Sequence, residues 1–162
     1  MKRLLIGALA MIPLCATAGP DDPIFTEGDW SAYKGDKNLT ILTTDKKEGS
    51  GLGMVCGIES EKCSWSVLAA PGLCKVGDKT PILFTGAGIG GIASEMACAM
   101  SDDEATMFEI REFDEITAIV SGSDHVQIAT PTESDGIVIV EYPTRGYVRA
   151  ATKLQRAHPP KK

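Results

Sequence analysis

The residues whose types and spacing most clearly suggest a chemical function are glycines that follow an apolar, strand-like segment at residues 81–85. Gly86, Gly88 and Gly91 form a G-x-G-x-x-G pattern, and Glu109 lies 23 residues after Gly86. In dinucleotide-binding βαβ units such glycines let the backbone approach a pyrophosphate at a helix N-terminus, and an acid at about this distance binds the ribose. The pattern therefore makes a dinucleotide cofactor one hypothesis for this chain.

The surrounding sequence favours a different structure for the glycines. Only 53 residues follow Glu109, which is too few for a second mononucleotide-binding half and a substrate site. Residues 92–100 fit a helical stripe, but Ile92, Met96 and Cys98 also fit the alternation of a strand. We therefore expect a glycine-rich hairpin and no cofactor, and the choice between helix and strand for residues 92–100 stays open.

Catalytic groups are few. His125 could be written into a triad with Asp124 and either Ser121 or Ser123, but neighbouring residues on a strand point to opposite faces and would not align. The carboxylates at 102–104 have the pattern of a solvated turn and lack the alternating oxygen ligands and central glycine of a calcium loop. The sequence thus predicts no catalytic or metal-binding residues and leans away from an enzyme.

The N-terminus has the pattern of a secretory signal. Lys2 and Arg3 precede an apolar run from Leu4 to Cys15, and the small residues at 16–18 suit cleavage after residue 18. An apolar run of this length is too short to span a bilayer, so we expect a periplasmic or secreted protein with no membrane span after processing. Removing the signal leaves 14 basic and 22 acidic residues, a formal net charge of −8. This charge argues against nucleic acid and favours a cationic partner.

Four cysteines remain after the signal, and they are expected to be oxidised in an exported chain. The intervals between Cys56, Cys63, Cys74 and Cys98 contain 6, 10 and 23 residues with no histidine among them, which does not fit a zinc site. We favour Cys56–Cys63 and Cys74–Cys98, because a polar turn between the first two would place them opposite each other in a hairpin. The other two pairings remain open.

The elements that would position these residues are mostly strands. Residues 19–29 are expected to form a flexible leader, 30–156 a single α+β domain, mainly antiparallel β and disulfide-stapled, and 157–162 a disordered tail. Helical spacing predicts short helices at 113–120 and 147–154. Strand-like patterns occur at 39–44, 52–57, 63–69, 81–85, 106–111, 125–130 and 137–142.

The C-terminal third carries a family resemblance. It rests on the spacing of Phe113, Ile116 and Ile119, the strand-like run His125–Thr130, and the segment 136–154, which includes Gly146-Tyr147-x-x-Ala150 and Leu154. These patterns resemble the end of invasion-associated locus B-like proteins, which are small exported proteins of Proteobacteria. The resemblance implies a periplasmic, non-catalytic protein with a role at the cell envelope or in host contact. It implies no functional residues.

The sequence as a whole predicts an exported, non-catalytic protein that binds an envelope or secreted partner, and the negative charge favours a cationic one. A small exported enzyme, an inhibitor of a cationic secreted hydrolase, and a dinucleotide-binding domain are the alternatives.

Overall fold

The computed structural model describes residues 22–157, with the exception of residues 46, 48, 61, 104 and 133–135. The expected signal, residues 1–18, and most of the expected tail lie outside the described residues. The elements are β1 (Phe25–Glu27), β2 (Trp30–Lys34), β3 (Asn38–Thr44), β4 (Gly51–Gly57), β5 (Cys63–Ala69), β6 (Lys79–Gly86), β7 (Gly90–Ser101), β8 (Thr106–Ile110), α1 (Phe113–Gly122), β9 (His125–Pro131), β10 (Ile137–Pro143) and α2 (Tyr147–Ala157).

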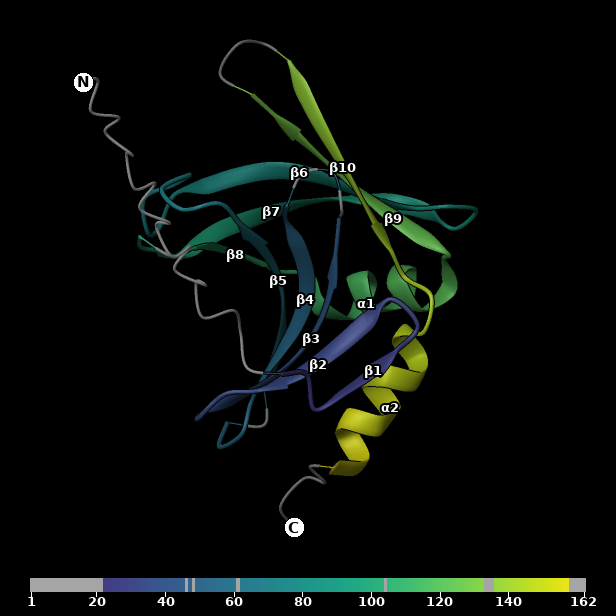
Figure 1. Cartoon of the computed structure of the whole chain (residues 1–162). Helices are drawn as coiled ribbons and strands as arrows, with labels where there is room; N and C mark the ends of the chain where they lie inside the picture. Colours follow the sequence, from purple (N-terminus) through teal and green to yellow (C-terminus); the bar gives the residue numbers. More distant parts are fainter. Residues whose placement is uncertain are drawn as a thin grey trace, which may run out of the picture.

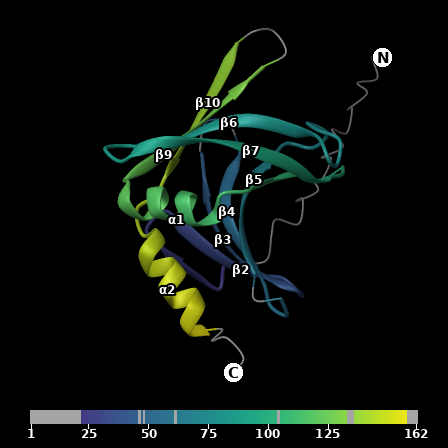
Figure 2. The same ribbon diagram turned by 180° about the vertical axis from the view of Figure 1, so that it is seen from behind.

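The strands of the described chain form one antiparallel sheet in the order β1-β2-β3-β4-β5-β8-β7-β6-β9-β10. The sheet curves around the two helices (Figures 1 and 2), with α2 against β1, β2 and β3 and α1 against β5, β6, β7 and β9. This arrangement confirms the expected α+β class dominated by antiparallel strands. No helix in the described part of the chain is long and apolar enough to cross a membrane.

The core is centred on an aromatic cluster that joins distant parts of the chain. The rings of Trp30 on β2, Trp65 on β5 and Tyr147 on α2 lie with centroids 5.2–6.1 Å apart in tilted or edge-on pairs. The Trp65 indole also donates a hydrogen bond of 2.9 Å to Thr117 on α1. Such pairs add to the hydrophobic gain from burying the rings. The cluster therefore fixes both helices on the same face of the sheet.

Two disulfides crosslink the sheet, and they are the two pairs favoured from the sequence. Cys56 and Cys63 face each other across β4 and β5. Cys74 is bonded to Cys98 and so ties the segment before β6 to β7. Backbone hydrogen bonds reinforce the second link, from the Gly77 amide to the Cys98 carbonyl and from the Cys98 amide to the Asp78 carbonyl.

Two segments differ from expectation or resolve an open choice. Residues 25–27, placed in the expected flexible leader 19–29, form β1 and pair with β2. The short strand is held because Phe25 packs against the core and Lys153 of α2 lies over its ring, with the ammonium 4.5 Å from the ring centroid. Residues 92–100 belong to the strand β7, not to a helix, because β7 pairs with β6 on one side and β8 on the other.

Candidate functional site

The glycine motif forms the turn of the β6–β7 hairpin and not the start of a helix. Gly88 and Gly90 adopt positive φ values of 78° and 103°, which a tight turn uses and which side chains disfavour. Gly86 is buried beside the end of α1, where a β-carbon would collide with the side chains of Ile119 and Ser123. The glycines therefore serve the turn and the packing of α1, and the βαβ unit of the cofactor hypothesis is absent from these residues.

Glu109 lies far from the glycine turn. It is on β8 and pairs with Ala97 of β7, six residues along that strand from Gly91. At about 3.3 Å per residue this separation is roughly 20 Å. Glu109 instead lines a cavity of about 370 Å³ beside the Cys56–Cys63 disulfide, together with Ser64 and Arg111. The structure thus does not bring the candidate ribose-binding acid and the glycines together.

The possible triad around His125 is also not assembled. Ser121 lies on α1 and donates its hydroxyl hydrogen bond to the Thr117 carbonyl. Ser123 is buried between α1 and β9. Within the described residues, no hydrogen bond joins either serine to His125. The same part of the chain contains no group of three or more His, Cys, Asp or Glu side chains placed to hold a metal ion.

The open edge of β10 is the most distinctive surface. The strand order places β10 at one end of the sheet, with β9 as its neighbour there. The Thr132 amide donates to the Gly136 carbonyl and the Thr144 amide to the Asp124 carbonyl, which fixes the hydrogen-bonded pairs between β9 and β10. Because these pairs alternate in an antiparallel ladder, Ile137, Ile139 and Glu141 direct their N–H and C=O groups away from β9.

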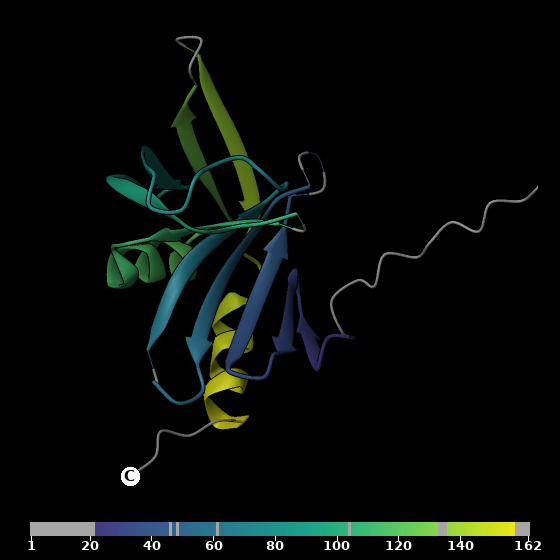
Figure 3. The same ribbon diagram turned by 90° about the vertical axis from the view of Figure 1, so that its left-hand side faces the viewer.

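Among the described residues, the base of this edge is the part that meets another strand, β3. The Pro143 carbonyl also faces away from β9, and it accepts a hydrogen bond of 3.1 Å from the Thr43 hydroxyl of β3. Beyond that point the β9–β10 hairpin extends past the rest of the sheet (Figures 1 and 3). The backbone from Ile137 to Glu141 is therefore open to an additional strand.

An apolar surface accompanies the open backbone. Ile137, Val138 and Ile139 follow one another along β10, with exposed fractions of 70%, 47% and 59%. On the outer face, Ile139 lies opposite Ala129 of β9, which lies opposite Leu83 of β6, and Leu83 is 48% exposed. We call Leu83, Ala129, Ile137 and Ile139, with the open backbone of residues 137–141, the edge surface. Contiguous exposed apolar residues of this kind mark contact sites.

A polar pocket adjoins the edge surface at its base. This base pocket has a volume of about 630 Å³ and is reached from the same outer face. Three carboxylates, a lysine and a histidine are among its lining residues, which are Asp29, Thr44, Asp45, Lys47, His125, Gln127, Ile139, Glu141 and Pro143. Ile139 and Glu141 belong to both features. The edge surface and the base pocket therefore form one continuous site.

The base pocket is held in place by β10 itself. Tyr142, whose side chain points to the opposite face, is buried and exchanges a hydrogen bond of 2.9 Å with the Ser50 hydroxyl beside the β3–β4 turn. Burial raises the pKa of the Tyr142 phenol, the Ser50 hydrogen bond opposes that shift, and the nearby Asp45 carboxylate adds to it. The phenol is therefore neutral at physiological pH, and its hydrogen bond with Ser50 anchors β10 on the face opposite to the base pocket.

Comparison with known proteins identifies a shared architecture. No family model matches the sequence, and no curated protein matches it. The crystal structure of invasion associated protein B from Bartonella henselae matches 82% of this chain and 96% of that chain, with a TM-score of 0.61 and 13% identity. The two proteins share a fold. The family resemblance drawn from the C-terminal third is confirmed at the level of fold.

Sequence reasoning missed the composition of the base pocket. Asp29 precedes β2, Asp45 follows β3, and Glu141 and His125 come from β10 and β9, so their meeting depends on the curvature of the sheet. The edge surface left a stronger signal in the sequence. The run Ile137-Val138-Ile139-Val140 contains no polar residue, whereas a strand with one face in water alternates polar and apolar residues.

Proposed function

We propose that this protein is an exported, non-catalytic binding protein that takes an extended segment of an envelope or host protein as an added strand on β10. The observation that carries the proposal is the open backbone of residues 137–141 beside exposed apolar side chains. Strand addition of this type uses backbone hydrogen bonds for affinity and alternating side chains for specificity. The two disulfides support a protein that works in an oxidising compartment.

The expected affinity is modest. Ile137, Ile139 and Glu141 together offer about six backbone donors and acceptors, and a net gain of about 1 kcal/mol for each bond is typical. The loss of translational and rotational freedom offsets at least about 4 kcal/mol of that gain. A short peptide that uses the backbone alone should therefore bind with a dissociation constant of roughly 30 mM or weaker, and apolar side chains of the peptide that contact Ile137 and Ile139 would lower that constant. A natural partner would add side-chain contacts to this basal affinity.

The test uses NMR spectroscopy with a synthetic ten-residue peptide that alternates valine and threonine. We expect the amide signals of Ile137, Ile139 and Glu141 to shift on titration and their hydrogen exchange to slow. Changes confined to β1, or no change at any residue, would refute the proposal.

Two substitutions at one position separate the backbone from the side chain. Ile139→Pro removes an N–H that does not bond to β9, so the hairpin should persist while strand addition is blocked. Ile139→Thr retains that N–H and the β-branched shape but adds a hydroxyl group. We expect the proline variant to weaken peptide binding more than tenfold and the threonine variant by about two- to fivefold. Equal weakening by both would show that the backbone of β10 takes no part.

A further inference from the structure

The base pocket adds chemistry to the open edge. We infer that the segment bound by β10 carries a cationic side chain, lysine or arginine, that enters the base pocket beside Glu141 and Asp45. This inference rests on the proposed strand addition and specifies its partner.

The two carboxylates that carry the inference have no cationic partner within 4 Å among the described residues. Asp29, the third carboxylate of the pocket, is paired with Arg145 at 3.3 Å. Asp45 instead accepts a hydrogen bond of 3.1 Å from the Lys47 amide, and Glu141 accepts one of 3.0 Å from the Gln127 side chain. Each of these contacts uses one carboxylate oxygen. The other oxygen of Asp45 and of Glu141 is available to a ligand in the described structure.

The geometry of strand addition directs a side chain to these carboxylates. Residues that face each other on paired strands place their side chains on the same face of the sheet, with β-carbons about 5 Å apart. Glu141 is on the outer face, as are Ile139 and Ile137 two and four positions away. A partner residue opposite Glu141 would therefore project into the base pocket, while its alternate neighbours would contact the isoleucines.

The charge of the chain favours this occupant over a second copy of the protein. The whole sequence has a formal net charge of −6, so two copies repel each other. Pairing of β10 with itself would also place no cation opposite Glu141, since the strand consists of apolar residues apart from Glu141 and Tyr142. A basic segment is attracted at long range and gains a specific contact at the pocket.

The experiment compares two peptides with the same alternating valine and threonine centre, one with lysine at both ends and one with glutamine. Lysine at both ends makes the comparison independent of strand direction. At about 50 mM salt we expect the lysine peptide to bind the wild-type protein about five- to twentyfold more tightly, and about 500 mM salt should remove most of the difference.

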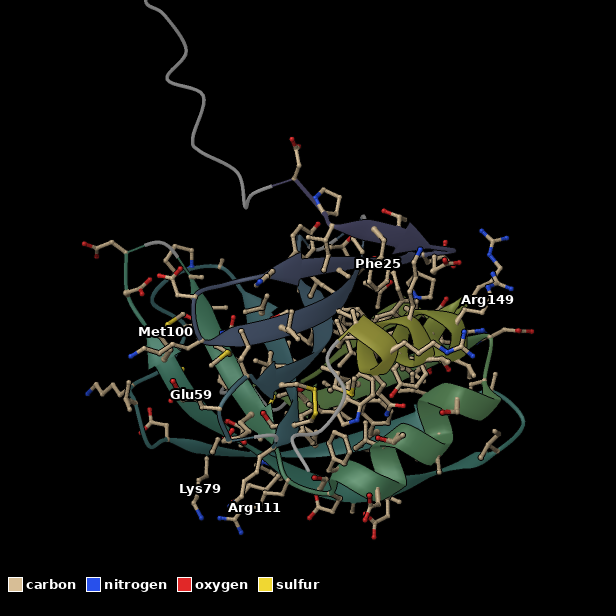
Figure 4. The ribbon with its side chains drawn as sticks, turned by 90° about the horizontal axis from the view of Figure 1, so that it is seen from below. Phe25, Glu59, Lys79, Met100, Arg111 and Arg149 are labelled. Carbon is tan, nitrogen blue, oxygen red and sulfur yellow. A yellow bond between two sulfur atoms is a disulfide. The ribbon has the colours of Figure 1, made fainter. Side chains whose placement is uncertain are left out.

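Variants locate the effect. Glu141→Gln keeps the hydrogen bond with Gln127 and should reduce the preference for lysine by about two- to fivefold, and Asp45→Asn should have a similar effect. Glu59→Gln is the matched control, because it removes one charge from the exposed turn after β4 (Figure 4). This turn follows β4, whereas Asp45 precedes that strand, so the two lie at opposite ends of β4. It should leave the preference unchanged.

The possible failures are distinguishable. Equal binding of both peptides at the edge would overturn the cationic inference but leave strand addition standing. If Glu59→Gln lowered the preference for lysine as much as Glu141→Gln does, the net charge of the protein would explain the preference. That result would overturn the role of the base pocket. Binding of neither peptide would overturn both proposals, and a dimer in analytical ultracentrifugation that Ile139→Pro dissociates would then assign the edge to a second copy.

Discussion

Proline at two neighbouring positions of β10 should have opposite consequences. Val138 is hydrogen-bonded to Thr130 across the β9–β10 ladder, whereas the Ile139 N–H points to the open side. Val138→Pro therefore removes a ladder bond and places the proline ring against β9. Ile139→Pro removes an amide hydrogen that no strand uses, and the preceding residue is already in the extended conformation that proline favours.

The hydrogen bonds and exposure of the two residues set the expected difference in hairpin stability between the two proline variants. Loss of the Val138 bond and the forced separation from Thr130 should destabilise the hairpin by about 2 kcal/mol, which corresponds to a roughly 30-fold higher population of the open form. For Ile139→Pro, the side chain is 59% exposed, so little burial is lost. The stiffer unfolded chain stabilises the variant by about 0.4–1 kcal/mol and offsets that loss. We expect a net change within about 1 kcal/mol.

Native-state hydrogen exchange of the Ile128 and Thr130 amides measures this directly, because both amides face β10. Their exchange should accelerate roughly 30-fold in Val138→Pro and less than about fivefold in Ile139→Pro. The opposite order would mean that the β10 register is shifted by one residue. In that case residues 138 and 140 would face the open side, and the edge surface as defined here would be wrong.

Two further predictions concern stability. The loop-closure contribution of a disulfide to stability grows with the length of the loop that it closes, and the two sequence separations are 24 for Cys74–Cys98 and 7 for Cys56–Cys63. Replacing Cys74 and Cys98 by serine should therefore destabilise the fold by about 3.5 kcal/mol, and replacing Cys56 and Cys63 by about 2.5 kcal/mol. Urea unfolding measures both changes, and the inverted order would contradict the chain-entropy account. Burial raises the pKa of Tyr147 above its ordinary value. The unfolded chain therefore loses this proton first, and stability should fall as pH rises above about 10, the unfolded pKa, until the folded pKa is passed. Tyr147→Phe should make that decline shallower in unfolding measurements at pH 9–11, and an unchanged slope would contradict it.

Much of the fold could be predicted because its signals are local. The runs at 125–130 and 137–142 are rich in β-branched residues and bounded by proline and glycine, and they became β9 and β10 with nearly the expected ends. The helix at 113–120 was visible in its apolar spacing, and α1 extends two residues further. Hairpin geometry favoured the Cys56–Cys63 pair, and Cys74 and Cys98 were then the two cysteines left to pair.

The remaining features depend on contacts between distant residues. Residues 92–100 satisfy both periodicities, and only pairing with β6 and β8 selects the strand. β1 has only three residues, so its formation depends on pairing with β2 and on contacts with α2. The base pocket likewise depends on four segments that only the curvature of the sheet brings together. No local pattern in the sequence contains that information.

The two edge strands of the sheet, β1 and β10, differ in length, charge and exposure, and this contrast argues that β10 contacts a partner. Sheet edges are usually short, charged or covered, because open edges pair with other chains. β1 fits that rule, since it has three residues and its Glu27 pairs with Arg149 and Lys153 of α2. Figure 4 shows Arg149 of α2 on the same side of the molecule as Phe25 of β1. β10 has seven residues, and its first four are apolar with no proline or charge among them. A chain that protects one edge and leaves the other open and apolar has the features of a protein that uses the open edge for binding.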